Sequence, residues 1–145
     1  MSTPPDSPAE RPSVDAERVD VGGYRMWMRV SPGRSPTVVF ESGGGDNSSV
    51  WSAVEPEVRR RTGASTVVYD RAGLGQSEPN PGPYQIDDEV AALRTALTAR
   101  GVRGPIVLVA HSYGGFVSLL MAGADREWGR SAWPSICSNF CPAIQ

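Results

Sequence analysis

The sequence has no lysine, a single histidine and only two cysteines, and it contains no apolar run long enough to cross a bilayer. Its 14 basic residues are all arginines, dispersed among 16 acidic residues, and the net charge is −2. Such a chain has no cluster of basic residues that would bind nucleic acid or an anionic membrane surface, so we expect neither as a partner. Cys137 and Cys141 lack histidine partners and make a poor zinc ligand set, so we expect no metal site and no cofactor.

The chain divides into three segments that differ in composition. Residues 1–15 are rich in proline and serine and are predicted to be a disordered N-terminal segment. They lack the basic start and apolar middle of a signal peptide, so we expect a cytoplasmic location. Residues 16–122 carry the hydrophobic patterns of one partial domain, whereas residues 123–145 show neither helical nor strand periodicity.

The patterned segment predicts a hairpin followed by alternating strands and helices. Residues 17–30 alternate with period two around Gly22 and Gly23, which is typical of two strands joined by a tight turn. Further strands are predicted at 37–40, 65–69 and 106–109, and helices at 50–61, 87–100 and 116–122. Ser48 or Ser49 is expected to cap the first helix. Strands that alternate with helices indicate an α/β fold with a mostly parallel sheet and helices on both faces.

The most informative stretch lies where the strand at 106–109 meets the helix at 116–122, both of which we expect to be buried. Between them lies Ala110-His111-Ser112-Tyr113-Gly114. A small residue, Ala110 or Gly114, stands two positions before and two positions after the serine. A sharp bend between a strand and a helix exposes the serine oxygen and directs the following backbone N–H toward the same point. This pentapeptide resembles the G-x-S-x-G nucleophile elbow of the α/β-hydrolase superfamily, which implies Ser112 as nucleophile and Tyr113 as an oxyanion-hole donor.

Two further loops carry the same resemblance. The strand at 37–40 leads into Glu41-Ser42-Gly43-Gly44-Gly45, and the resemblance implies Gly44 as the second oxyanion-hole donor. The strand at 65–69 leads into a loop that is similar to the Asp-Arg-x-Gly-x-Gly-x-Ser loop of the superfamily. The resemblance implies that this loop forms a wall of the site. The residues assigned to the wall are Gly43, Asp70, Arg71 and Gly73.

The proton acceptor that a serine nucleophile needs is missing from the pattern. The resemblance implies a later acid and a later histidine, but the only histidine is His111, and Asp125 is the only aspartate after Ser112. We interpret His111 as a packing residue under the elbow. Our hypothesis is that the chain is the N-terminal part of a longer hydrolase and that residues 123–145 are out-of-frame or otherwise altered coding. Reading the DNA past codon 123 in the other frames tests this, and finding no Val/Leu strand and no later histidine there would refute it.

The expected function is therefore that of a serine hydrolase acting on a carboxylic ester or related acyl compound through a Ser112 acyl-enzyme. This chain is expected to be an inactive or weakly active fragment. A serine at the elbow argues against the halide-removing and epoxide-opening relatives, which use aspartate. Two alternatives stay open, a non-catalytic module that binds a small apolar ligand and an interaction fragment. The expected partners are a small-molecule acyl substrate and a second copy of the chain, paired through an exposed apolar edge strand.

Overall fold

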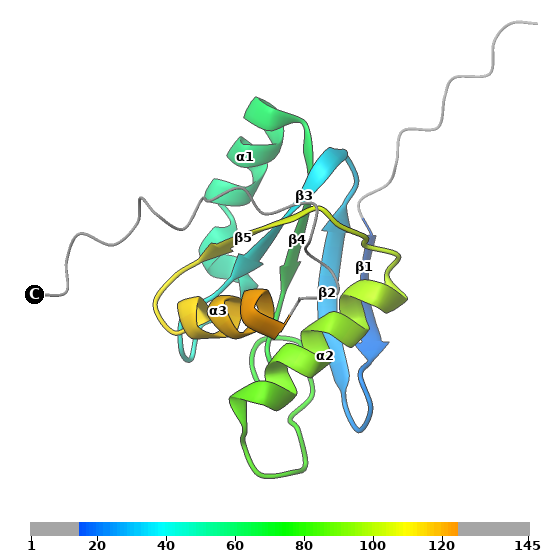
Figure 1. Ribbon diagram of the computed structural model, residues 1–145, viewed down its shortest axis with the longest axis vertical. Helices are drawn as coiled ribbons and strands as arrows, with labels where there is room; N and C mark the ends of the chain where they lie inside the picture. Colours follow the sequence, from blue (N-terminus) through cyan, green and yellow to red (C-terminus); the bar gives the residue numbers. More distant parts are fainter. Residues whose placement is uncertain (1–14, 125–145) are drawn as a thin grey trace, which may run out of the picture.

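A computed structural model describes residues 15–124 of the chain (Figure 1). The strands are β1 (Asp15–Asp20), β2 (Arg25–Ser31), β3 (Arg34–Glu41), β4 (Ala64–Tyr69) and β5 (Ile106–Ala110). The helices are η1 (Ser48–Trp51, a 3-10 turn), α1 (Val54–Thr62), α2 (Ile86–Ala99) and α3 (Gly114–Ala124). Our predictions for residues 1–14 and for the tail from 125 onward lie outside the described residues.

The five strands form one mixed sheet in the order β1-β2-β4-β3-β5. The β1–β2 hairpin is antiparallel and joins antiparallel to β4, whereas β3 lies parallel to both β4 and β5. The three parallel strands all end at one edge, with Phe40 beside Val68 and Glu41 beside Ala110. The loops after β3, β4 and β5 therefore meet at this edge, where open α/β sheets bind ligands. The predicted class, a hairpin followed by parallel strands with helices on both faces, is confirmed.

Each face of the sheet has its own hydrophobic layer. Figure 1 shows α2 and α3 in front of the sheet and α1 behind it. The layer under α2 and α3 contains Met26, Met28, Val39, Val67 and Leu93, all of them fully buried. The opposite layer, under α1, is smaller and centres on Phe40 and Val68, with Trp51 packed against Phe40 at 5.1 Å between ring centroids. Period-two strands produce this arrangement because successive side chains point to opposite faces.

The predicted start of the first helix is wrong by several residues. The segment divides into η1 and α1, and the N-terminal cap of η1 is Asn47, whose side chain accepts a hydrogen bond from Ser49 N at 2.9 Å. An asparagine oxygen satisfies a free N–H at a helix start as well as a serine does, and the periodicity alone did not distinguish them. The three arginines 59–61 fall in the last turn of α1, as expected for cations at the negative end of a helix.

Two segments predicted as buried are only partly so among the described residues. Strand β5 pairs on one side with β3, and three of its five residues are half-buried. Helix α3 buries Val117 and Met121 against the sheet but leaves Phe116 and Leu119 exposed. The apolar content of both segments predicted contacts on all sides, and within residues 15–124 only one side is covered. No helix in this range is long and apolar enough to span a membrane.

Candidate active site at the β5–α3 corner

Ser112 lies at the corner between β5 and α3. Its φ angle is +51°, and it is the only residue other than glycine with a positive φ in the described part of the chain. The turn is closed by hydrogen bonds from Gly114 N to His111 O (3.0 Å) and from Gly115 N to Ser112 O (2.9 Å). A left-handed conformation is unfavourable for a side-chain-bearing residue and is characteristic of strained functional corners. The result is a serine that stands exposed at the end of the sheet.

The small residue required after the serine has a direct steric cause. A β-carbon added at Gly114 would lie 2.5 Å from Glu41 O and 2.7 Å from Ser42 O, which are backbone atoms at the end of β3. His111 N donates to Glu41 O at 3.0 Å, so the chain is hydrogen-bonded to β3 just before Ser112 and passes close to it just after. The start of α3 therefore passes over the β3 backbone at a distance that only glycine permits.

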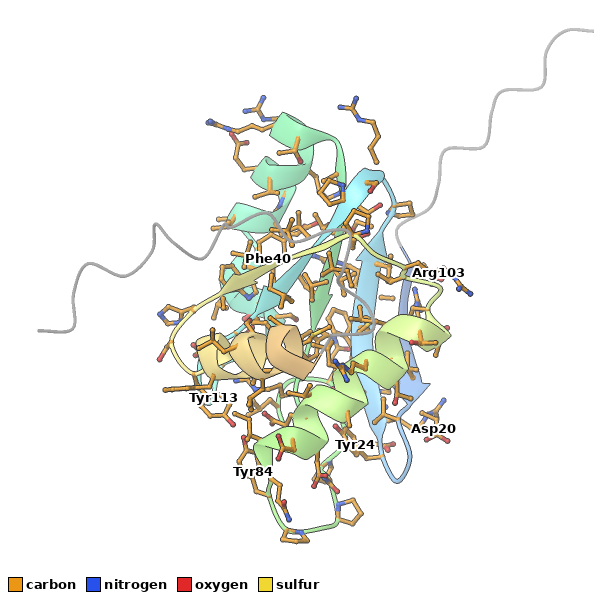
Figure 2. The ribbon with its side chains drawn as sticks, in the orientation of Figure 1. Asp20, Tyr24, Phe40, Tyr84, Arg103 and Tyr113 are labelled. Carbon is orange, nitrogen blue, oxygen red and sulfur yellow. The ribbon has the colours of Figure 1, made fainter. Side chains whose placement is uncertain are left out.

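The triple-glycine loop lies against this corner, as the sequence predicted. A β-carbon at Gly44 would lie 3.5 Å from Tyr113 Cβ, and one at Gly43 would lie 2.8 Å from His111 Nδ1. The backbone of the loop therefore lies close to the residues on either side of Ser112. Figure 2 shows Tyr113 at the beginning of α3. The residues assigned to the nucleophile and to the two oxyanion donors, Ser112, Tyr113 and Gly44, are brought together at one edge of the sheet.

Arg71 connects the loop after β4 to the glycine loop. Its side chain is 4% exposed and donates to Ser42 O at 2.6 Å and to Gly43 O at 2.5 Å. Its guanidinium lies over the Tyr113 ring, 5.1 Å from the centroid. The sequence placed Arg71 in the wall of the site, and the structure places its side chain against the carbonyls of Ser42 and Gly43.

Asp70 organises the loops rather than facing the corner at Ser112. Its carboxylate accepts hydrogen bonds from Ser48 N at 2.7 Å and from Gln76 N at 2.9 Å, which joins the glycine-loop segment to the loop after β4. The Ser77 hydroxyl donates to Asp70 O at 2.6 Å. Gly73, with φ +74°, allows the sharp turn of this loop. The distinctive Asp-Arg-x-Gly-x-Gly-x-Ser pattern is therefore explained by internal hydrogen bonds and turn geometry.

A buried acid at the end of β3 was not among the residues the sequence singled out. The Glu41 side chain is fully buried and accepts a hydrogen bond from the Tyr69 hydroxyl at 2.5 Å, while its second oxygen has no hydrogen-bond partner. Burial raises the pKa of Glu41 to about 7, although the Tyr69 hydroxyl and Arg71 act in the opposite direction. Burial, reinforced by Glu41, raises the pKa of Tyr69 well above its usual value. A charged residue directly after an apolar strand was the available signal.

Glu89 on α2 is the second acid near Arg71. Its carboxylate lies 3.8 Å from Arg71 Nε and accepts a hydrogen bond from the Tyr84 hydroxyl at 3.1 Å. Burial raises the pKa of Glu89, and the Arg71 charge opposes that shift. The helical spacing of α2 indicated only an acidic first turn, because a sequence pattern does not show which loop will pack against it.

The interpretation of His111 as a packing residue is wrong. Its side chain is 65% exposed, and Nδ1 lies 4.0 Å from Asp46 Oδ2. The residue occupies the last position before the corner, where the chain leaves the sheet, so no layer covers it. Within residues 15–124 no histidine or carboxylate is hydrogen-bonded to Ser112, and no three metal-binding side chains converge.

Two clefts lie away from the corner. One of about 550 Å³ is situated between β2 and α1 and is lined by polar residues, among them Arg29, Ser48 and Glu55. The other, of about 370 Å³, lies between α2 and α3. Ser112 lines neither of them, and the chemical argument for a site at the corner depends on the elbow geometry.

Comparison with known proteins identifies the family of the chain. A model of the alpha/beta hydrolase family matches residues 38–143, and the chain belongs to this family. It is 36% identical over 91 residues to the uncharacterized protein YqjL of Bacillus subtilis, covering 63% of this chain and 35% of that protein. It is 29% identical over 104 residues to the putative hydrolase LipZ of Mycobacterium tuberculosis, covering 71% of this chain and 35% of that protein.

The fold is similar to that of the epoxide hydrolase VrEH1 from Vigna radiata, with a TM-score of 0.69 and 26% sequence identity. That similarity covers 79% of this chain and 36% of the other chain. The chain therefore spans about a third of the length of these relatives. Its described residues form a partial alpha/beta hydrolase fold.

Proposed function

We propose that this chain carries the nucleophile and oxyanion-binding half of a serine hydrolase acting on a carboxylic ester or related acyl compound. The observation that carries the proposal is the left-handed conformation of Ser112 at the β5–α3 corner, between His111 and Tyr113, the two residues that lie close to Gly43 and Gly44. Strain of this kind at an exposed serine between a strand and a helix is the signature of a nucleophile elbow.

The reaction begins with attack of Ser112 Oγ on the carbonyl carbon of the substrate. The new C–O bond forms as the carbonyl π bond opens, and the resulting oxyanion accepts hydrogen bonds from the N–H groups of Tyr113 and Gly44. Removal of one such donor costs about 2.7–4 kcal/mol of barrier. The alcohol of the substrate then leaves, and water releases the acyl group from the serine.

The serine proton must go to a base during attack, and the described residues place no base at Ser112. The single histidine of the sequence points to solvent beside Asp46. We infer that the acceptor and the acid that orients it come from outside this chain, in the part of the relatives that the chain does not cover. The chain alone is therefore expected to have negligible esterase turnover.

VrEH1 is an epoxide hydrolase, and the similarity to it supports the fold but not that reaction for this chain. The epoxide-opening relatives attack with a carboxylate, whereas residue 112 is a serine. An acyl-transfer chemistry fits the hydroxyl nucleophile better.

A fluorophosphonate probe in the presence of added imidazole tests the proposal. The probe attaches to an activated serine, and imidazole in solution supplies the absent proton acceptor. We expect labelling, read by intact mass, that imidazole accelerates and that Ser112→Ala abolishes. Ser49→Ala, which removes another exposed hydroxyl, should leave labelling unchanged. Labelling that persists in Ser112→Ala, or no labelling of the unaltered chain, would refute the proposal.

A further inference from the structure

Arg71 binds the two carbonyl groups that precede the proposed oxyanion donor Gly44. Its two terminal nitrogens bond Ser42 O and Gly43 O, and the side chain is almost fully buried. A guanidinium presents its N–H groups in a planar fork, so a pair of acceptors fixes its orientation and the guanidinium fixes theirs. The Gly43 carbonyl also accepts a longer hydrogen bond from Asp46 N at 3.2 Å, and the Ser42 hydroxyl is engaged with Asn47 O and Trp51 Nε1. Arg71 is therefore the side chain that holds both carbonyls.

The Gly43 carbonyl and the Gly44 N–H belong to one peptide plane. The cis peptides of the described chain precede Pro36 and Pro105, so this peptide is trans. In a trans peptide the C=O and N–H point in opposite directions. A guanidinium that holds the Gly43 carbonyl on one side therefore directs the Gly44 N–H away from itself, on the other side of the loop.

Arg71 also contacts the residue that carries the other proposed donor. Its guanidinium carbon lies 5.1 Å from the centroid of the Tyr113 ring, within the range of a cation–π contact. One side chain thus touches both the oxyanion loop and the first residue after Ser112. Figure 2 shows Tyr113 projecting from the start of α3.

We propose that Arg71 is the positioning residue of the oxyanion hole, setting the direction of the Gly44 N–H and the placement of Tyr113 together. This inference rests on the proposed function of Ser112. Arg71 itself does not contact the substrate in this arrangement; it acts through the two carbonyls and the ring. Glu89, 3.8 Å from Arg71 Nε, balances the buried charge and orients the fork from the α2 side.

Arg71→Lys tests the positioning role because lysine keeps the charge but lacks the planar fork. In the imidazole-assisted labelling reaction, we expect the maximal labelling rate to fall by about tenfold to a hundredfold, as for a misdirected oxyanion donor. The probe concentration that gives the half-maximal rate should stay the same, because the alkyl part of the probe does not touch Arg71.

Arg100→Lys is the matched control. Arg100 is 5% exposed, forms ion pairs with Asp15 and Glu17, and donates to Asp15 O, but it lies in the region of β1, away from the elbow. Its replacement should leave the labelling rate unchanged. Equal losses in Arg71→Lys and Arg100→Lys would show that only stability is affected and would overturn the positioning role.

Backbone amide resonances give a second measurement that does not need labelling. In Arg71→Lys the ¹H–¹⁵N resonances of Gly44 and Tyr113 should shift, while those of Gly22 and Gly101 should not. If Arg71→Lys does not fold, Glu89→Gln replaces it and should shift the same two resonances by less. If the unaltered chain shows no Ser112-dependent labelling, the proposed function fails. Separately, if the Gly44 and Tyr113 resonances do not shift in Arg71→Lys, the positioning role of Arg71 is overturned.

Discussion

At the scale of single residues, the corner depends on how closely two backbones approach. Gly114 begins α3 directly over the carbonyls of Glu41 and Ser42, and Gly115 beside it faces open space. Of two adjacent glycines in one helical turn, only Gly114 is required by close packing. Replacing each glycine by alanine therefore distinguishes two effects: the steric clash that alanine would cause at Gly114, and the helix stability that alanine generally adds over glycine.

Gly114→Ala should lower the free energy of unfolding by about 1–3 kcal/mol, because the new methyl group must displace the backbone of β3 or of α3. Gly115→Ala, the matched control, meets no atom within 4 Å and should be neutral or slightly stabilising. Urea denaturation of the two variants measures the difference. Equal stabilities would mean that α3 does not cross β3 as closely as the structure shows.

At the scale of elements, the ends of β3 and β4 share a buried acid and phenol. Glu41 and Tyr69 are hydrogen-bonded to each other, and Arg71 and Glu89 are the charged groups nearest to them. The raised pKa of Glu41 means that the folded state binds a proton that the unfolded state releases between about pH 4.5 and 7. Stability from this group is therefore fully present below about pH 4.5 and is lost as the pH rises through 7.

Glu41→Gln should remove this dependence while keeping an acceptor for the Tyr69 hydroxyl. Relative to the unaltered chain, we expect the variant to gain up to about 3 kcal/mol between pH 4.5 and pH 8, following the shift of the pKa to about 7. Chemical denaturation of both chains at these two pH values gives the difference. A constant difference across the range would show that Glu41 does not titrate with a raised pKa in the folded state.

At the scale of the whole molecule, apolar surface collects at one edge. Strand β5 pairs with β3 alone among the described residues, and α3 beside it leaves Phe116 and Leu119 exposed. An unpaired apolar strand next to an apolar helix face favours association with a second chain. We therefore expect the isolated chain to self-associate at this edge and to be poorly soluble.

Leu119→Glu should raise the dissociation constant of this association by about tenfold, because a leucine that is 61% exposed would otherwise become buried between the copies. Thr95→Glu, at an exposed position on α2, is the control for added charge alone. Sedimentation velocity at several concentrations measures both. A chain that is monomeric throughout and melts cooperatively would contradict the expectation.

The sequence by itself determined the order of the elements and the loops that meet, because period-two and helical patterns follow from side-chain direction alone. It predicted the hairpin, the three parallel strands, the elbow at Ser112 and the glycine loop beside it. It did not predict that Asn47 would cap the turn after that loop, since asparagine and serine are equivalent caps in sequence.

Only the tertiary structure decided what surrounds each of these residues. That Arg71 holds the carbonyls of the glycine loop, that Glu41 is buried against Tyr69, and that His111 faces solvent all depend on segments distant in sequence. A pattern of residue types reports which face of an element is apolar. It does not report which neighbouring backbone will come within hydrogen-bond distance, because that distance is set by the packing of the whole sheet and its helices.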